Sequence, residues 1–108
     1  MGSKYILPMR IIAKRTLRRF WETHPGGAEA KTPLQVWHST VEGADWATPA
    51  DVKASYGDAS ILKNSRVVFN IVGNKLRLVT RINFPYRVVY VRFVGTHEEY
   101  DHIEAEAI

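Results

Sequence analysis

Arginine and lysine residues without acidic neighbours dominate the second half of this sequence. Seven of them fall between Ala59 and His97, a stretch with no aspartate or glutamate, whereas Glu98–Ile108 holds five acids and no lysine or arginine. A shorter basic segment, Arg10–Arg19, holds five basic residues and no acid. Guanidinium groups bind phosphate oxygens through paired hydrogen bonds, so a polyanion such as RNA would explain this segregation.

His97 is the residue best suited to transfer protons in such a site. Histidine is the side chain that ordinarily exchanges protons near neutral pH, and Tyr100 and Asp101 follow within about one helical turn. When RNA is the substrate, its own 2′-hydroxyl can attack the phosphodiester, so neither a metal nor a protein nucleophile is needed. Arginines would hold the phosphate and stabilise the charge that develops on it. We therefore expect a phosphodiester-cleaving site that uses no cofactor.

Other reaction classes find little support. The chain has no cysteine, which excludes disulfides, a thiol nucleophile and thiolate zinc sites. It has no Gly-x-Ser-x-Gly motif and no glycine-rich phosphate loop. His97 and His102 are five residues apart and do not share a helical face, so we expect no metal site.

The length of 108 residues, with 45% hydrophobic residues and a net charge of +4, fits one domain. We expect this domain to span residues 9–108 and residues 1–8 to be an N-terminal extension. No apolar run approaches the roughly 20 residues of a membrane-spanning helix, and the short apolar run at residues 5–7 is too brief for a signal peptide. A cytoplasmic protein without membrane contact is expected, although cysteine-free chains are also secreted.

The first half of the chain has helical periodicity. Leu17, Phe20 and Trp21 follow the spacing of one helical face, and Leu34 and Trp37 begin another. Thr-Pro pairs at 32–33 and 48–49 are typical of helix starts. The sequence predicts an edge strand over Arg10–Lys14, helices over Thr16–His24, from an N-cap at Thr32 to Gly43 and from an N-cap at Thr48 to Gly57, and a loop over Gly57–Ser65.

The second half is rich in Val, Ile, Phe and Tyr, as β-strands are. Gly73-Asn74 is typical of a two-residue hairpin loop, and a second turn follows at 83–86. The expected fold is α+β, an antiparallel β-sheet with helices packed on one face. The predicted elements are strands over Arg66–Val72, Lys75–Asn83 and Arg87–Val94, then a short terminal helix over His97–Ala107.

The hairpin loop fixes which residues share a face of the sheet. With Val72 opposite Lys75, directly opposed residues of the antiparallel pair point to the same side. The expected core face carries Val67, Phe69, Ile71, Leu76, Leu78, Thr80 and Ile82, with Val89, Val91 and Phe93 from the third strand. The other face carries Arg66, Val68, Asn70, Arg77, Val79, Arg81 and Asn83, with Tyr90 and Arg92.

Arg66 and Arg81 form a like-charge pair in this register, which costs stability. No acid between residues 59 and 97 offsets it. A merely solvated outer face normally mixes both charge signs. Four arginines beside Asn70 and Tyr90 therefore favour a bound polyanion.

Two stretches, VVFNIVGNKLRLV (67–79) and VYVRFVGTHEEYD (89–101), resemble the HigB toxins, a branch of the RelE-like toxin superfamily. The segments at 10–12, 16–22 and 46–53 are similar to the same family, so the likeness covers almost everything from Met9 onward. It implies an mRNA interferase that cuts mRNA without metal, usually on the ribosome. It also implies a HigA-type helix-turn-helix antitoxin, with operator DNA bound only through the antitoxin complex.

With this resemblance, roles can be assigned to individual residues. We assign His97 as general acid or base and Arg77 as the main phosphate clamp, while Tyr100 stacks on a base or shares in proton transfer. Further RNA-binding residues are Arg66, Asn70, Arg81, Tyr90, Arg92 and Asp101, and ribosome contacts are expected at Arg15, Arg18 and Arg19.

Two other classes of function stay open. A non-catalytic RNA- or ribosome-binding module would have the same arginines but no working proton-transfer group. A structural or DNA-binding protein fits less well, because the basic helix shows no helix-turn-helix pattern.

Overall fold

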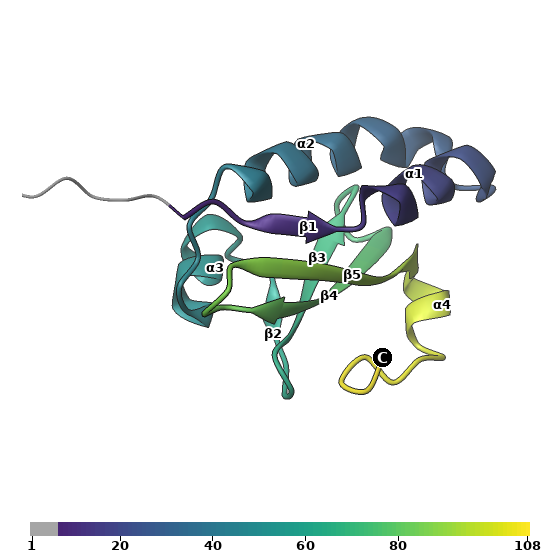
Figure 1. The fold of residues 1–108 in the computed structure, drawn as a ribbon. Helices are drawn as coiled ribbons and strands as arrows, with labels where there is room; N and C mark the ends of the chain where they lie inside the picture. The colour runs from purple at the N-terminus through teal and green to yellow at the C-terminus, as the bar shows by residue number, and fades with distance from the viewer. Residues whose placement is uncertain (1–6) are drawn as a thin grey trace, which may run out of the picture.

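A computed structural model describes residues 7–108, in which α-helices pack on one face of a β-sheet (Figure 1). The predicted extension over residues 1–8 lies mostly outside the described residues. In chain order the elements are β1 (Arg10–Ile12), α1 (Lys14–Thr23), a single 3₁₀ turn (Ala28–Ala30), α2 (Lys31–Glu42), α3 (Pro49–Ser55), β2 (Ser60–Ile61), β3 (Arg66–Ile71), β4 (Leu76–Asn83), β5 (Val88–Thr96) and α4 (His97–Tyr100).

The sheet has five strands in the order β1-β5-β4-β3-β2. The predicted α+β class is confirmed, and the strands from β2 to β5 are antiparallel to their neighbours. β1 instead runs parallel to β5, so the sheet is mixed. β2 lies within the stretch Gly57–Ser65 that was expected to be a loop, where two residues pair with β3.

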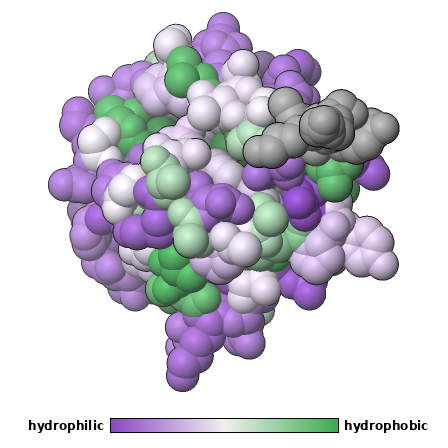
Figure 2. All heavy atoms as spheres, turned by 90° about the vertical axis from the view of Figure 1, so that its left-hand side faces the viewer, coloured by the Kyte–Doolittle hydropathy of each residue, from purple (hydrophilic) through white to green (hydrophobic). Residues whose placement is uncertain are grey.

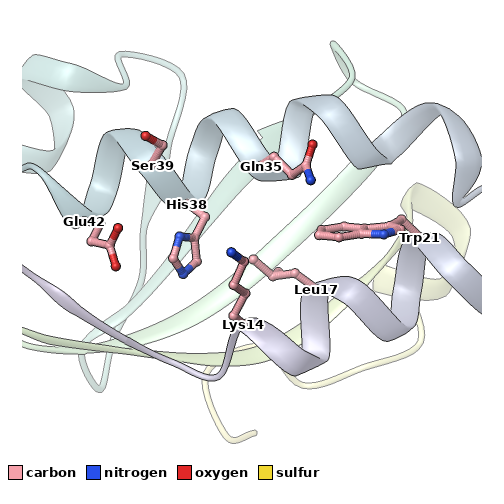
Figure 3. A pocket seen from close by; sticks show the side chains of 7 residues that line it. All are labelled: Lys14, Leu17, Trp21, Gln35, His38, Ser39 and Glu42. Carbon is pink, nitrogen blue, oxygen red and sulfur yellow. The ribbon is translucent and has the colours of Figure 1, made fainter.

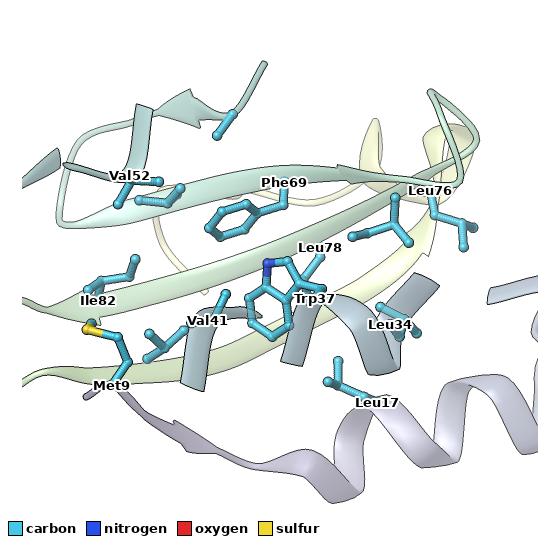
Figure 4. Close-up of a cluster of buried hydrophobic side chains, with 14 of the residues drawn as sticks. Met9, Leu17, Leu34, Trp37, Val41, Val52, Phe69, Leu76, Leu78 and Ile82 are labelled. Carbon is cyan, nitrogen blue, oxygen red and sulfur yellow. The ribbon is translucent and has the colours of Figure 1, made fainter. Parts of the chain in front are cut away.

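Helices α1 and α2 cover one face of the sheet and bury its apolar side chains (Figures 1 and 4). Leu17 from α1 and Leu34 and Trp37 from α2 are at most 1% exposed. Trp37 meets Phe69 of β3 edge-on, with ring centroids 5.4 Å apart. The predicted core residues of the hairpin, including Thr80, are all buried. Val68 and Val79, which were assigned to the other face, are buried too, so that face is partly covered rather than fully open.

The helix starts were predicted with unequal success. Thr48 caps α3 as expected, and its hydroxyl accepts the N–H of Asp51 while the Asp51 carboxylate accepts the N–H of Thr48. Thr32 is not a cap, because the preceding 3₁₀ turn already starts the helix and α2 begins at Lys31. Pro33 still lies in the first turn, where its missing N–H removes no helical hydrogen bond.

The register of β3 with β4 is confirmed: Arg66 pairs with Arg81 and Asn70 with Arg77. The turn between the strands differs in detail from the expected Gly73-Asn74 loop. Val72 and Gly73 take left-handed conformations, with φ of 54° and 62°. A β-branched residue is strained there, so the hairpin bears a local conformational cost at Val72.

A bulge shifts the register of β5 against β4. Val79 pairs with Phe93 and Thr80 with Val91, which leaves Arg92 as the extra residue. The prediction that Phe93 faces the core is therefore wrong, since beyond the bulge Phe93 shares the side of Val79. Val94 takes the core position and packs against the buried cluster.

The terminal helix is much shorter than predicted. α4 has four residues, and the expected helix over His97–Ala107 is wrong beyond Tyr100. The following residues, 101–108, which we call the C-terminal segment, form turns on the sheet face opposite α1 and α2 (Figure 1). Hydrogen bonds with residues near the start of β3 replace those of a continued helix. No helix among residues 7–108 is long and apolar enough to cross a membrane.

Candidate nucleic-acid interface

The sheet face opposite the helices carries a track of cations, which we call the arginine face. Arg81 and Arg92 are exposed, and the other members are partly buried. Its members are Arg66, Asn70, Arg77, Arg81, Tyr90 and Arg92, with Tyr90 directly opposite Arg81.

Three arginines cluster at one end of this face. Partial burial, and then the charges of Arg81 and Arg92, lower the pKa of Arg66 below that of a free guanidinium. Such mutual repulsion falls when an anion binds between the side chains. The three guanidinium groups therefore concentrate positive charge at this end of the arginine face.

Arg66 is not free in this structure, which corrects the expectation of a fully uncovered arginine surface. Its Nε donates to the main-chain oxygen of Ile108 at 2.8 Å, and Nη2 contacts the same oxygen. Its Nη1 donates to the carbonyl of Asn64 at 2.8 Å. Nearby, the Asn64 amide donates to the carbonyl of Glu106 at 3.1 Å. The acidic C-terminal segment thus lies against the start of β3.

Asn70 and Arg77 occupy the other end, near the hairpin. Asn70 donates to both the carbonyl and the carboxylate of Asp58 at 3.2 Å. Arg77 donates through Nη1 to the carbonyl of Asn74 at 2.9 Å. Both side chains are therefore held by nearby loops rather than by each other.

The two ends are too far apart to bind one phosphate. Arg77 and Arg81 are four residues apart on β4, about 13 Å along a strand. The arginine face is accordingly an extended track that suits successive phosphates of a polynucleotide.

His97 lies beside the hairpin end of this track. Thr96 pairs with Leu76, and the His97 N–H donates to the carbonyl of Lys75 at 3.2 Å. The imidazole is 56% exposed, and its Nδ1 lies 3.3 Å from the Asp101 carboxylate. A carboxylate on Nδ1 fixes the orientation of the ring, so this pair is placed to deliver or accept a proton.

The side chains of Tyr100 and Asp101, two residues of the C-terminal motif, have different neighbours. Asp101 contacts His97, whereas Tyr100 borders a hollow of about 340 Å³ together with Leu62 and Ile103. No arginine of the described residues lines that hollow. The structure brings His97 and Asp101 together and places Tyr100 toward the C-terminal segment.

The basic residues of α1 lie in the helical layer, not on the arginine face. Arg15, Arg18 and Arg19 are all exposed, so they lie on the solvent-facing side of α1. Arg19 borders a small hollow of about 380 Å³ with Phe20 and Val94. A view of the end of the molecule that carries α3 shows hydrophilic side chains over most of the surface and small, separate apolar patches (Figure 2).

A groove of about 550 Å³ separates α1 from α2 (Figure 3). His38 projects into it between Lys14 and Glu42. Burial lowers the pKa of His38, Glu42 opposes this, and Lys14 lowers it further. The groove lies in the helical layer and adds nothing to the arginine face.

Sequence reasoning missed two long-range contacts, one with the arginine face and one beside His97. Asp58 holds Asn70 from a loop that was given no role, and Glu99 contacts His24 from 75 residues away. A capping-box spacing, Thr96 followed by Glu99, was the one local signal for the second contact.

Comparison with known proteins identifies the family. The family model described as HigB_toxin, RelE-like toxic component of a toxin-antitoxin system, matches residues 30–103. The chain belongs to the HigB toxin family. The matched region includes the whole arginine face, His97 and Asp101.

Curated HigB relatives cover nearly the whole chain. The mRNA interferase toxin HigB of Escherichia coli (strain K12) is 31% identical over 99 residues, 90% of this chain and 92% of that protein. The mRNA interferase HigB of Shigella flexneri has the same identity and coverage. The mRNA interferase HigB of Escherichia coli O6:H1 is 27% identical over 95 residues, 86% of this chain and 89% of that protein.

Proposed function

We propose that this HigB-family toxin is an endoribonuclease that cuts mRNA. The observation that carries the proposal is the register of β3 with β4, which places Arg66 opposite Arg81 and Arg77 beside the strand that leads into His97. Four arginines lie on β3, β4 and β5, strands that contain no aspartate or glutamate, and they form a track for a phosphodiester backbone. The HigB relatives, named as mRNA interferases, support the same substrate.

The reaction proposed is transfer of the phosphoryl group to the RNA's own 2′-hydroxyl. The 2′-oxygen loses its proton and bonds to phosphorus, and the 5′-oxygen leaves with a proton, giving a 2′,3′-cyclic phosphate and a 5′-hydroxyl. His97, oriented by Asp101, accepts or donates one of these protons, and Arg77 holds the phosphate. Arg81 and Arg92 bind neighbouring phosphates, Tyr90 contacts the bound strand, and Tyr100 completes the site once the C-terminal segment moves.

The partners proposed are those of a toxin–antitoxin pair. A HigA-type helix-turn-helix antitoxin neutralises the toxin and carries it to operator DNA. Cutting takes place on the ribosome in the cytoplasm, where Arg15, Arg18 and Arg19 contact ribosomal RNA. The exposed, acid-poor face of α1 supports this docking.

A cleavage assay with two substrates tests the proposal. Purified protein is incubated with programmed ribosomes in their Mg²⁺ buffer, and separately with naked mRNA in the presence of EDTA, and primer extension maps the cuts. We expect defined cuts on ribosome-bound mRNA and cyclic-phosphate ends. RNA that is bound but never cut contradicts the enzymatic proposal.

One observation favours a non-catalytic RNA-binding module as the second candidate. His97 is at the hairpin end of the arginine face, whereas Arg66, Arg81 and Arg92 cluster at the other end, away from this proton-transfer group. If the wild-type protein binds RNA through the arginine face without cutting it, the module is the correct function.

A further inference from the structure

His24 and Glu99 join the end of α1 to the start of α4. The Nε2 atom of His24 lies 3.1 Å from both carboxylate oxygens of Glu99. The His24 side chain is 22% exposed and the Glu99 side chain 48%, so water only partly screens the contact. The pair belongs neither to the arginine face nor to the groove between α1 and α2.

The second ring nitrogen of His24 identifies its tautomer. The backbone N–H of Gly26 donates to Nδ1 at 2.9 Å, so Nδ1 carries no proton. A neutral imidazole then has its hydrogen on Nε2, which donates to the Glu99 carboxylate. The ring is also stacked on Phe20, with centroids 4.4 Å apart, which holds its orientation.

The Glu99 carboxylate that contacts His24 is also part of the cap of α4. Its Oε1 accepts the N–H of Thr96 at 2.8 Å, and the Thr96 hydroxyl accepts the N–H of Glu99 at 3.1 Å. A Cβ on Gly95 would lie 2.9 Å from this Oε1 and 2.4 Å from the Phe93 ring. The glycine therefore leaves the space that the carboxylate occupies.

His97 is the first residue inside this cap. A helix of four residues has too few hydrogen bonds to hold itself in place, so contacts from outside must fix it. Two such contacts hold α4: the His97 N–H donates to the Lys75 carbonyl, and the Glu99 carboxylate accepts a hydrogen bond from His24.

We propose that His24 is a positioning residue for His97: by donating to Glu99 it holds the cap of α4, and with it the His97 imidazole, at the hairpin end of the arginine face. The consequence for RNA cleavage rests on the proposed function. The consequence for the position of His97 does not, because it concerns the free protein alone.

His24→Leu and His24→Gln test the proposal together. Leucine keeps bulk against Phe20 but cannot donate, whereas the glutamine amide reaches Glu99 in place of Nε2. We expect His24→Leu to lower kcat roughly ten- to a hundred-fold with KM little changed, since small misplacements of a reacting group have effects of this size. His24→Gln should restore most of kcat. His38→Leu, the same change at a histidine in the α1–α2 groove, is the matched control and should leave kcat unchanged.

Hydrogen exchange of the His97 amide gives a readout that does not depend on cleavage. In His24→Leu we expect this amide to exchange at least about ten-fold faster, as the bond to Lys75 opens more often, while amides of the α2 core keep their rates. An unchanged exchange rate at His97, or a wild-type kcat in His24→Leu, overturns the inference. If the wild-type protein cuts no RNA, the proposed function fails, and the exchange rate still decides whether His24 positions His97.

Discussion

Arg66 and Arg81 lie directly opposite each other on β3 and β4, and Arg92 is close enough to add a third positive charge. Directly opposed like charges destabilise an antiparallel pair. In this arrangement Arg66 donates to the main-chain oxygen of Ile108 in the C-terminal segment. The cost has a functional explanation if the same arginines bind RNA.

Replacing Arg81 with glutamine separates stability from binding. We expect Arg81→Gln to raise the free energy of unfolding by about 0.2–1 kcal/mol at low salt and to weaken RNA binding. Denaturant unfolding and fluorescence anisotropy with a short single-stranded RNA measure the two effects. Arg81→Lys, which keeps the charge, serves as the control; a loss of stability in Arg81→Gln would contradict the repulsion argument.

His97 is expected to be needed for cutting but not for binding. His97→Ala should lower the cleavage rate at least about 100-fold, the usual contribution of a general acid or base, with RNA affinity nearly unchanged. Asp101→Asn should have a smaller effect, because it orients the ring rather than transferring the proton. His102→Ala is the matched control, since His102 is exposed and outside α4. Full activity in His97→Ala would remove His97 from the mechanism.

Charge reversal on α1 is expected to distinguish ribosome docking from RNA binding. The variant with Arg18→Glu and Arg19→Glu should cut ribosome-bound mRNA several-fold more slowly while binding a short RNA normally, because α1 and the arginine face belong to different layers. Primer extension measures the cutting of ribosome-bound mRNA, and fluorescence anisotropy measures the binding of the short RNA. Equal losses in both assays would show that α1 belongs to the RNA site itself.

Glu99 predicts an acid-sensitive contribution to stability. The backbone N–H of Thr96, and then the side chain of His24, lower the pKa of Glu99 below its ordinary value of 4.5. A carboxyl group with a lowered pKa in the folded state stabilises the protein fully above its unfolded pKa, and this contribution is lost as the pH falls through the folded value. Unfolding should therefore show a decline in stability below about pH 4.5 that is reduced in Glu99→Gln. A decline of the same size in that variant would exclude Glu99 as its source.

The sequence predicted the β3–β4 ladder because two strict alternations and a tight turn leave only one register that buries the apolar face. Thr48 was recognised because its cap is local. The bulge at Arg92 has no such local signal: it depends on how β5 is paired, and it moves Phe93 out of the core. The parallel pairing of β1 with β5 joins segments far apart in the chain and is equally non-local.

For the candidate site, residue types were easier to predict than contacts. The arginines and His97 follow from composition and strand register. The contacts of Asn70 with Asp58 and of His24 with Glu99 depend on where loops and helix ends meet, which pattern alone does not fix. The terminal helix was predicted too long because tertiary contacts with Arg66 and Asn64 override the helix propensity of its acidic residues.

Ile108 occupies a place at Arg66 that a phosphate oxygen would otherwise take. If RNA binds the arginine face as proposed, it competes with the protein's own chain at this end of the sheet, whereas Arg81 and Arg92 are open to solvent. Engagement should consequently begin at the open guanidinium groups and reach Arg66 last, once the terminal residues have been displaced.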